Sequence, residues 1–243
     1  MIDFSWLSRT ELLIGRENLN KLSNAHVLIL GMGGVGSFAA EFIARGGIGK
    51  MTIVDGDTID PSNRNRQLPA LATNHGQRKV NIMAERLLSI NPELSLQVID
   101  EFIRPEAIAQ LLDTDAHYII DAIDSLTPKL TCLKTAHEKG LRIVSSMGAG
   151  GKLDPTQIKV TDISKTYNCP FAQQIRKQLR NGGIRKGLKV VFSTELPDKN
   201  SIMRTDGSNF KKSAYGTMSY LPAMFGATLA SVVIRDLMAQ NKA

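Results

Sequence analysis

Short apolar runs rich in β-branched residues alternate with longer amphipathic runs over the first two-thirds of the 243-residue chain. The short runs predict strands at 25–30, 50–54, 94–99, 117–120 and 142–145. The longer runs predict helices at 35–45, 75–90, 105–112 and 127–138. This alternation is typical of an α/β fold in which helices cover both faces of a mostly parallel, Rossmann-like sheet.

The pattern changes after Ser146. A glycine-rich turn at 148–151 leads to predicted strands at 157–160 and 190–193, and a basic helix is predicted at 171–180. We expect no crossover helix between parallel neighbours in this part of the chain. The sheet should therefore be extended by antiparallel strands, and a polar loop over 197–213 should follow.

Twenty residues from 215 to 234 carry no charge, which is long enough for a membrane span. Glycine, serine, threonine and proline make this run only weakly hydrophobic, so we expect a buried helix that is interrupted or begins near Pro222. No integral membrane span is expected, although loose membrane attachment through this helix stays open.

Positive charge is concentrated in one segment of a chain whose net charge is +7. Between 163 and 194 there are seven basic residues and no acidic one, whereas the first half of the chain is nearly balanced. Such a segment is typical of a surface that binds a polyanion, and a solvated basic helix without a partner is the alternative. The candidate phosphate contacts are Arg176, Lys177, Arg180, Arg185, Lys186 and Lys189, with Lys165 nearby.

The two cysteines, Cys132 and Cys169, lie far apart, and the first residues lack the pattern of a secretory signal. Both observations predict a protein of the reducing cytoplasm. No Cys-x-x-Cys pair is present, so no structural zinc is expected. Cys132 should pack inside a helix, whereas Cys169 could be exposed in a loop, where a structural role is favoured over a catalytic one.

The strongest local motif is Gly31-Met32-Gly33-Gly34-Val35-Gly36, between the first predicted strand and the first predicted helix. Glycines here let a phosphate approach backbone amides at the positive end of a helix, and Asp55 after the second strand is suited to bind a ribose. A nicotinamide or flavin dehydrogenase fits these features about as well as an ATP-using enzyme, and glycines needed only for packing are a structural alternative.

Further polar residues favour ATP. Arg66 and Lys79 can neutralise a triphosphate, and Asp124 can bind Mg²⁺ through a carboxylate oxygen. Each also has a structural interpretation: Arg66 as a surface charge, Lys79 as a solvated helix position, and Asp124 as the N-cap of a helix that begins at Thr127. Their order after one glycine loop is the stronger argument.

That order resembles the ubiquitin-activating, ThiF-like superfamily of adenylating enzymes. The matching motifs are Asp55-Gly56-Asp57, Asn63-Arg64-Asn65-Arg66-Gln67, Gly76-Gln77-Arg78-Lys79 and Asp121-Ala122-Ile123-Asp124. The resemblance implies a ribose contact by Asp55, phosphate contacts by Asn63, Arg66 and Lys79, and Mg²⁺ binding by Asp124. It implies that the nucleotide site also includes Gly31, Gly33, Gly34, Gly36, Asp57 and Gln67.

The segment Ser8-Arg9-Thr10-Glu11-Leu12 resembles the part of that superfamily that carries an arginine finger. In the family this arginine reaches into the site of the neighbouring subunit. The resemblance therefore implies a homodimer, with Arg9, Arg66, Lys79 and Asp124 as the catalytic residues.

Within the superfamily, the chain is most similar to the family of bacterial tRNA threonylcarbamoyladenosine dehydratases, nearly from end to end. The supporting segments include 9–15, Asp121-Ala122-Ile123-Asp124-Ser125, 148–156 and Val191-Phe192-Ser193-Thr194-Glu195. The resemblance implies an ATP-dependent cyclising dehydration of N6-threonylcarbamoyladenosine beside the tRNA anticodon, through adenylation of the substrate carboxylate. It makes tRNA the polyanion that the basic segment binds.

One position departs from this family. Some relatives carry a cysteine immediately before Val191-Phe192-Ser193, where this chain has Val190. Relatives can be linked to cysteine desulfurase systems, so a sulfur-trafficking accessory protein stays open as a partner, and the departure weakens any sulfur-transfer role.

Three other functions stay open at this point. The chain could adenylate the C-terminal glycine of a ubiquitin-like sulfur-carrier protein, bind RNA and nucleotide without catalysis, or use a nicotinamide cofactor. Carrier-dependent pyrophosphate exchange, RNA binding without ATP turnover, or preference for NAD would distinguish them. We interpret the chain as one adenylating domain over 1–243, with a nucleotide-binding part at 1–146 and a substrate- and RNA-facing extension at 147–243 that ends in the closing helix.

Overall fold

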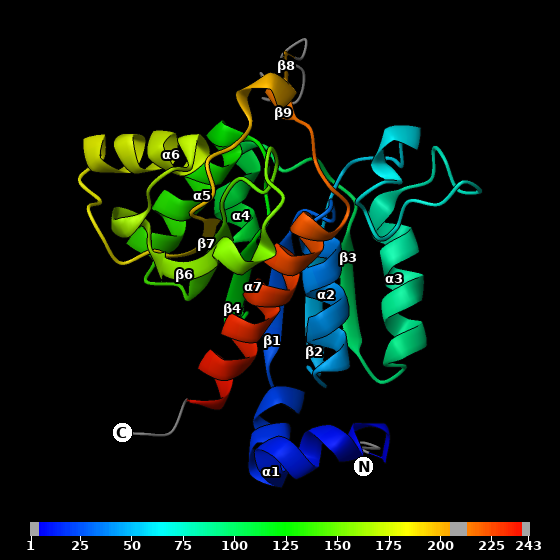
Figure 1. Cartoon of the computed structure of the whole chain (residues 1–243). Helices are drawn as coiled ribbons and strands as arrows, with labels where there is room; N and C mark the ends of the chain where they lie inside the picture. The colour runs from blue at the N-terminus through cyan, green and yellow to red at the C-terminus, as the bar shows by residue number, and fades with distance from the viewer. Residues whose placement is uncertain (1–4, 205–212, 240–243) are drawn as a thin grey trace.

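The computed structural model describes residues 5–204 and 213–239. A seven-stranded sheet in the order β3-β2-β1-β4-β5-β7-β6 forms its centre (Figure 1). The strands are β1 (His26–Leu30), β2 (Lys50–Val54), β3 (Ser95–Ile99), β4 (Tyr118–Asp121), β5 (Ile143–Ser146), β6 (Ile158–Asp162) and β7 (Lys189–Ser193). Every pair of neighbours is parallel except β6 and β7, so the mostly parallel sheet predicted from the sequence is confirmed.

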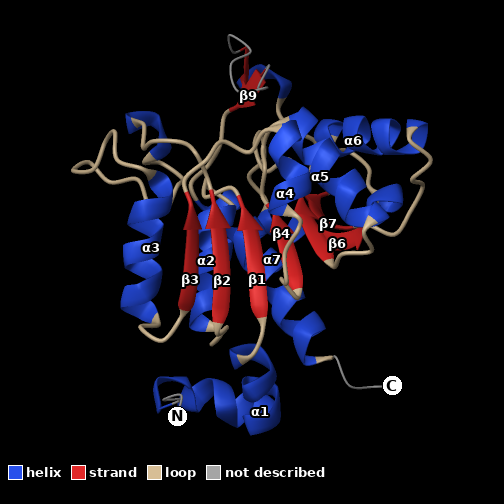
Figure 2. Ribbon diagram, turned by 180° about the vertical axis from the view of Figure 1, so that it is seen from behind, coloured by secondary structure: helices blue, strands red, loops and turns tan. Residues whose placement is uncertain are grey.

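Helices cover both faces of this sheet (Figure 2). One face packs against α2 (Gly36–Arg45), α3 (Lys79–Ile90) and α7 (Tyr220–Met238), and the other against α4 (Ile108–Leu111), α5 (Leu126–Glu138) and α6 (Pro170–Asn181). Strand β1 is buried along its whole length. Val27 and Ile29 pack in the hydrophobic core on the side of α2, α3 and α7, and Leu28 and Leu30 pack in the core on the side of α4, α5 and α6. A strand that is apolar on both faces belongs in the centre of such a sheet.

The antiparallel extension of the sheet is confined to β6. Strand β7 lies between β5 and β6 and runs parallel to β5, with Ser145 opposite Val190. Strand β6 and helix α6 lie between β5 and β7 in the chain. This long connection brings the chain back to the end of the sheet at which β5 begins, so that β7 can run parallel to β5. The strands of the predicted extension therefore share one sheet with those of the predicted nucleotide-binding part.

The uncharged run forms α7, a helix long and apolar enough to cross a membrane by length and composition. Half of its apolar window is buried inside the protein. Leu221, Phe225, Leu229 and Val233 pack in the core that α7 shares with α2 and the sheet. Gly226 permits this close contact, because a Cβ there would lie 2.5 Å from the carbonyl oxygen of Val35.

The predicted loop at 197–213 contains regular structure. Two short strands, β8 (Ile202–Arg204) and β9 (Ser213–Tyr215), pair as an antiparallel ribbon, and residues 205–212 of the predicted loop lie outside the described residues. The ribbon lies above the carboxyl ends of the central strands (Figure 1). The residue that follows β9 joins the glycine-rich turn, because Gly151 N donates to Gly216 O over 2.7 Å.

A first helix, α1 (Ser8–Ser23), was not predicted from the sequence. It lies below the amino ends of the strands and is broken at Gly15, whose φ is +77° (Figure 1). Helix α3 begins at Lys79 rather than at residue 75, because the preceding residues form turns and a bridge between Thr58 and Arg78. The described part also contains short 3₁₀ helices η1 (Ser5–Leu7), η2 (Pro61–Asn63), η3 (Pro105–Ala107), η4 (Pro155–Gln157), η5 (Ile163–Lys165) and η6 (Lys199–Ser201).

Candidate active site

The glycine loop joins β1 to α2 at the carboxyl edge of the sheet, where ligands bind in open α/β folds. Glycine is required at Gly31 and Gly36, and Gly34 is tightly packed. Gly31 has a φ of +94°, a Cβ on Gly34 would lie 3.0 Å from Pro222 Cβ, and a Cβ on Gly36 would lie 1.8 Å from Gly31 O. Gly33 differs, because among the described residues beyond its chain neighbours the atom nearest to its Cβ position is Gln67 Nε2, at 3.8 Å. Gly33 therefore leaves an open cradle at the start of α2.

Asp55 follows β2 and holds this loop in shape. Its Oδ2 accepts from the Met32 amide at 2.7 Å, and its Oδ1 accepts from the Asp57 amide at 2.8 Å. Burial raises the pKa of the Asp55 carboxyl, although nearby Lys79 acts in the opposite direction. The carboxylate predicted to contact a ribose therefore also fixes the second residue of the glycine loop.

Lys79 begins α3 and points inward. The residue is 4% exposed, and its Nζ donates to Asp57 Oδ2 over 2.8 Å. Its interpretation as a solvated helix position is therefore wrong. A buried ammonium beside a half-exposed carboxylate is suited to bind the oxygens of a phosphate.

The segment 63–67 lies beside the loop. Asn63 is buried and completes a capping box with Asp60, the N-cap of η2, because its Oδ1 accepts from the Asp60 amide at 3.2 Å. Arg66 is half-buried, with its Nη1 donating to Ser62 O and Asn65 Oδ1, both over 2.8 Å. Gln67 Oε1 is buried and has no hydrogen-bond partner in the described part of the chain. Buried polar atoms of this kind are rare, and a bound ligand is one way to satisfy them.

Asp124 lies on the turn that follows β4, and its carboxylate is exposed. Ser125 Oγ donates to its Oδ1 over 3.3 Å, and Ser125, not Asp124, is the N-cap position of α5. The N-cap alternative for Asp124 is therefore wrong. No group of three or more His, Cys, Asp or Glu side chains able to hold a metal was found within residues 5–204 and 213–239. One carboxylate suits Mg²⁺ when the phosphates of a nucleotide supply further oxygens.

A buried ionic group next to this turn was missed in the sequence. Lys129 Nζ lies 2.6 Å from Asp121 Oδ2, and both side chains are fully buried. Ser145 Oγ, on the neighbouring strand, donates to the same carboxylate oxygen over 2.6 Å. The available signal was a lysine in the first turn of a buried helix, eight residues after the acid at the end of a strand.

Arg9 is exposed on α1, at the end of the molecule opposite the glycine loop (Figure 1). Helix α1 lies below the amino ends of the strands, whereas the other predicted site residues lie at the carboxyl ends. The structure therefore separates Arg9 from the site of its own chain.

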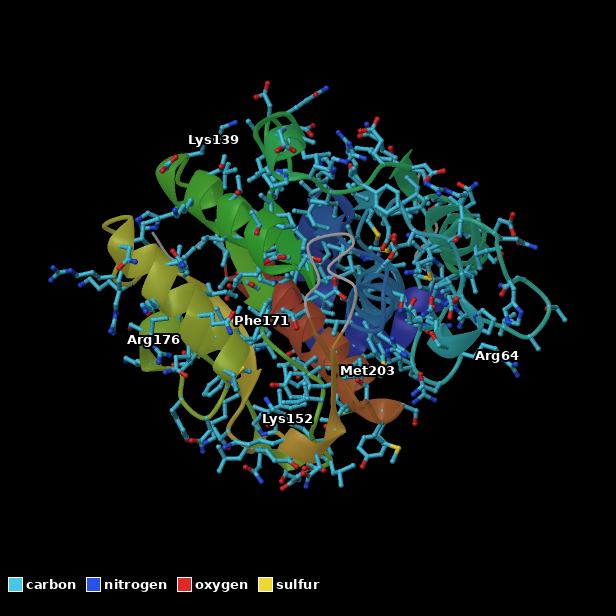
Figure 3. The ribbon with its side chains drawn as sticks, turned by 90° about the horizontal axis from the view of Figure 1, so that it is seen from above. Arg64, Lys139, Lys152, Phe171, Arg176 and Met203 are labelled. Atoms are coloured by element: carbon cyan, nitrogen blue, oxygen red, sulfur yellow. The ribbon has the colours of Figure 1, made fainter. Side chains whose placement is uncertain are left out.

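The basic segment is divided by the fold. Lys177 and Arg180 are exposed on α6, and Arg185 and Lys186 are exposed in the turn that follows it. Arg176 instead donates to Thr166 O over 2.7 Å, and Lys189 forms an ion pair with Asp236 of α7. Gln173, Arg176, Lys177, Arg180 and Asn181 line a hollow on α6. Seen from above the carboxyl ends of the strands, Arg176 and Arg64 lie on opposite sides of the molecule (Figure 3).

Both cysteines are buried. Burial raises the pKa of the Cys132 thiol, as expected for a packed side chain. The exposure that the sequence left open for Cys169 is not found, since the residue is 4% exposed, precedes α6 and packs in the core with Ala172 and Ile175. Buried Lys152 lies near it, and burial lowers the pKa of the Lys152 ammonium although Cys169 and Glu195 act in the opposite direction.

Together, the glycine cradle, two cations and an exposed carboxylate converge at one edge of a parallel sheet. The model of the ThiF family matches residues 7–242. The chain belongs to the ThiF family. The family assignment agrees with the superfamily resemblance found in the motifs from Asp55 to Asp124.

Individual relatives are similar over nearly the whole chain. The chain is 40% identical to a tRNA threonylcarbamoyladenosine dehydratase of Bacillus subtilis (strain 168), over 95% of this chain and 94% of the relative. The structure of E. coli tRNA N6-threonylcarbamoyladenosine dehydratase, TcdA, in complex with ATP superimposes with a TM-score of 0.88 and 37% identity, covering 99% of this chain and 98% of that one. Similarity to the E. coli sulfur carrier protein ThiS adenylyltransferase is weaker, at 29% identity over 62% of this chain and 61% of that protein.

Proposed function

We propose that this ThiF-family chain catalyses the ATP-dependent dehydration of N6-threonylcarbamoyladenosine next to the anticodon of tRNA. The observation that carries the proposal is its similarity over nearly the full length to dehydratases with that name, one of them solved with ATP. The glycine cradle and the orphaned Gln67 Oε1 support a nucleotide at this edge of the sheet.

In the proposed reaction, a carboxylate oxygen of the threonyl group attacks the α-phosphorus of ATP, and pyrophosphate leaves. A nucleophilic atom of the adjacent carbamoyl group then attacks the activated acyl carbon, AMP leaves, and the nucleophile loses a proton. The substrate therefore loses one water and becomes cyclic. Because the nucleophile is tethered to the acyl group, the step needs no protein thiol.

Arg66 and Lys79 would stabilise the negative charge that develops on the phosphates. Lys79 is suited to this role because its buried ammonium is already oriented by Asp57. Asp55 would contact the ribose while keeping the Met32 amide in place, and Asn63 and Gln67 would complete the phosphate side of the site.

Asp124 would hold Mg²⁺ together with the nucleotide phosphates. The ion would supply positive charge that neutralises the phosphate oxygens. The fit rests on the chemistry of the donor, since an exposed carboxylate at the carboxyl end of a central strand matches the preference of Mg²⁺ for carboxylate and phosphate oxygens.

The tRNA would bind along α6 and the turn after it. Lys177, Arg180, Arg185 and Lys186 present exposed charges there. Arg176 and Lys189 would contribute less than their neighbours, because each is already bound inside the protein. A cytoplasmic location agrees with two reduced, buried cysteines, and the sulfur-trafficking accessory protein stays a prediction.

The active unit would be a homodimer in which Arg9 acts in the site of the partner. Helix α1, which carries Arg9, lies below the amino ends of the strands of its own sheet (Figure 1). Leu12 and Leu13 on the same helix are each 84% exposed, which is unusual for leucines and would be relieved by contact with a second copy.

Mixing two inactive variants tests the dimer. Arg9→Ala and Asp124→Ala should each abolish turnover alone. A one-to-one mixture that exchanges subunits should recover about a quarter of the wild-type rate, because half of the dimers then contain one intact site. A mixture without recovered activity, despite subunit exchange shown by mass spectrometry, would contradict the shared site.

The reaction itself is tested with tRNA that carries the modified adenosine. Incubation with the protein, ATP and Mg²⁺ should lower the mass of the modified nucleoside by one water. Unchanged tRNA in the presence of folded protein would refute the proposal. Pyrophosphate exchange that depends on a carrier protein would point to the sulfur-carrier reaction instead, and tRNA binding without ATP turnover would indicate a binding module.

A further inference from the structure

Lys129 is a fully buried lysine on α5 that joins three elements. Its Nζ donates to Asp121 Oδ2 at the end of β4, over 2.6 Å, and to Ser145 Oγ on β5, over 3.1 Å. Ser145 Oγ donates in turn to Asp121 Oδ2. All three side chains are excluded from solvent. The ring of Phe171, on α6, lies 6.0 Å from the ammonium.

Stability alone does not account for such a group. Removing two charges from water is costly, and apolar side chains of similar size often stabilise a fold as well as a buried ion pair does. The surroundings are apolar, since Cys132 and Leu133 of the same helix are also fully buried. What the ion pair provides is a fixed orientation for the Asp121 carboxylate.

That carboxylate shapes the turn that carries Asp124. Asp121 Oδ1 accepts from the Ile123 amide over 3.0 Å, within the turn. The other side of the turn lies against the glycine loop, because Ala122 N donates to Leu30 O over 2.9 Å and Ala122 O lies 3.0 Å from the Cβ position of Gly31. The turn is therefore held between the buried ion pair and the glycine loop, and Asp124 is its last residue before the Ser125 cap.

We propose that Lys129 is a positioning residue of the nucleotide site, which fixes the turn at 121–124 through Asp121 so that the Asp124 carboxylate meets the metal and phosphates of the bound nucleotide. The inference rests on the proposed role of Asp124 in binding Mg²⁺. Lys129 itself touches neither the nucleotide nor the metal. Supporting groups of this kind commonly change metal affinity without being ligands.

Without the ammonium, Asp121 would be left as a buried carboxylate without its counter-charge. Such a group becomes protonated or draws in water, and in either case its hold on the Ile123 amide weakens. Asp124 would then sample several positions, and each productive encounter with Mg²⁺ would require the turn to order again.

The test compares Lys129→Met with Leu133→Ala, a control one turn further along α5 that removes a buried side chain outside the ionic group. Two quantities are measured without RNA. The first is the Mg²⁺ concentration at which ATP binding, measured by calorimetry, reaches half of its maximum, and the second is the rate of hydrogen exchange in the peptide around Ile123. Lys129→Met should raise that Mg²⁺ concentration by about tenfold or more and speed exchange at Ile123. Leu133→Ala should lower the melting temperature and leave both readouts near wild type.

Two further variants keep the test decisive if Lys129→Met folds poorly. Ser145→Ala keeps the ion pair and should shift both readouts in the same direction by a smaller factor, and Lys129→Arg should restore part of the Mg²⁺ dependence. The proposal is overturned if Lys129→Met or Ser145→Ala loses only stability, as the control does. A wild-type protein that binds Mg²⁺ and ATP but leaves modified tRNA unchanged would refute the proposed function without affecting this inference.

Discussion

The Nζ of Lys79 lies 2.8 Å from Asp57 Oδ2, and the lysine side chain is only 5% exposed whereas that of the aspartate is 47% exposed. The ammonium therefore lies inside the candidate site and is oriented by a group of the protein itself. Its partner is the group that faces solvent, so an entering phosphate would meet a cation that is already oriented. Catalytic electrostatics depend on such preorganisation, because no reorientation is then needed during the reaction.

Replacing Lys79 by Met should remove this cation while keeping an unbranched side chain. Because the developing phosphate charge loses one buried partner, we expect kcat with ATP and modified tRNA to fall by about 10²- to 10³-fold. Asp57→Asn is the matched variant, since it keeps the ammonium and loosens its orientation, and its effect should be smaller. Turnover near the wild-type rate in Lys79→Met would exclude Lys79 from the catalytic residues.

Gly33→Ala separates folding from nucleotide binding. Within residues 5–204 and 213–239, and apart from its chain neighbours, the added Cβ would meet no atom closer than Gln67 Nε2, at 3.8 Å, so the melting temperature should stay close to wild type. The same methyl group would occupy the cradle, so ATP affinity measured by calorimetry should fall by at least about tenfold. By contrast, Gly36→Ala should disrupt the loop itself, because its Cβ would overlap Gly31 O. ATP binding at wild-type affinity in Gly33→Ala would place the phosphates elsewhere.

Exposed and internally bound basic residues should differ in tRNA binding. The double variant Lys177→Ala, Arg180→Ala should lose about two phosphate contacts. The slope of the logarithm of tRNA affinity against the logarithm of salt concentration should become correspondingly less steep. Lys189→Ala is the control, because Lys189 is paired with Asp236 and its loss should mainly affect stability. Affinity is measured by fluorescence anisotropy over a series of salt concentrations. An unchanged salt slope in the double variant would remove α6 from the RNA surface.

His26, at the amino end of the sheet, should make the protein less stable in acid. Its ring bonds Asp115 Oδ1 over 2.7 Å and Thr52 Oγ1 over 2.9 Å, and burial lowers its pKa below the usual 6.5 despite the Asp115 contact. The unfolded chain therefore binds a proton at His26 more readily than the folded chain does. The contribution of neutral His26 to the free energy of unfolding is complete above pH 6.5, and it decreases as the pH falls toward the pKa of the folded state. Asp115, whose pKa the Lys50 and His26 contacts lower to about 2, stays charged in this window.

Urea unfolding at about pH 7.5 and about pH 5.5 measures this effect. His26→Gln keeps a neutral hydrogen-bonding side chain and should reduce the difference between the two pH values. His75→Gln, at an exposed histidine, is the control. Equal pH dependence in the wild type and His26→Gln would show that other groups cause the loss of stability.

Much of the fold is predictable from local pattern. Strand β1 carries apolar residues on both faces, so its burial is specified by its own residues wherever neighbouring strands pair. The glycine loop is also largely local, since Gly36 is required by its contact with Gly31 O and Gly31 by its own positive φ. The order of Asp55, Arg66, Lys79 and Asp124 predicted one edge of the sheet, because each lies between the carboxyl end of a strand and the first residue of the next long helix.

Other features depend on contacts between residues far apart in the chain. Strand β7 is parallel to β5 because of the path that β6 and α6 impose between them, and no local pattern in β7 encodes that direction. Cys169 is buried and Lys189 is paired because α6 and α7 pack over them. The sequence shows which residues of these segments are apolar or charged, but it does not show which residues they contact.

The glycine loop, the buried strands and the family motifs therefore follow from the sequence, because short-range geometry and burial on both faces constrain them. The separation of Arg9 from its own site, the inward orientation of Lys79 and the ion pair of Lys129 with Asp121 required the folded chain. Charged side chains are long and adopt many rotamers, so their positions depend on which distant groups the fold brings within reach.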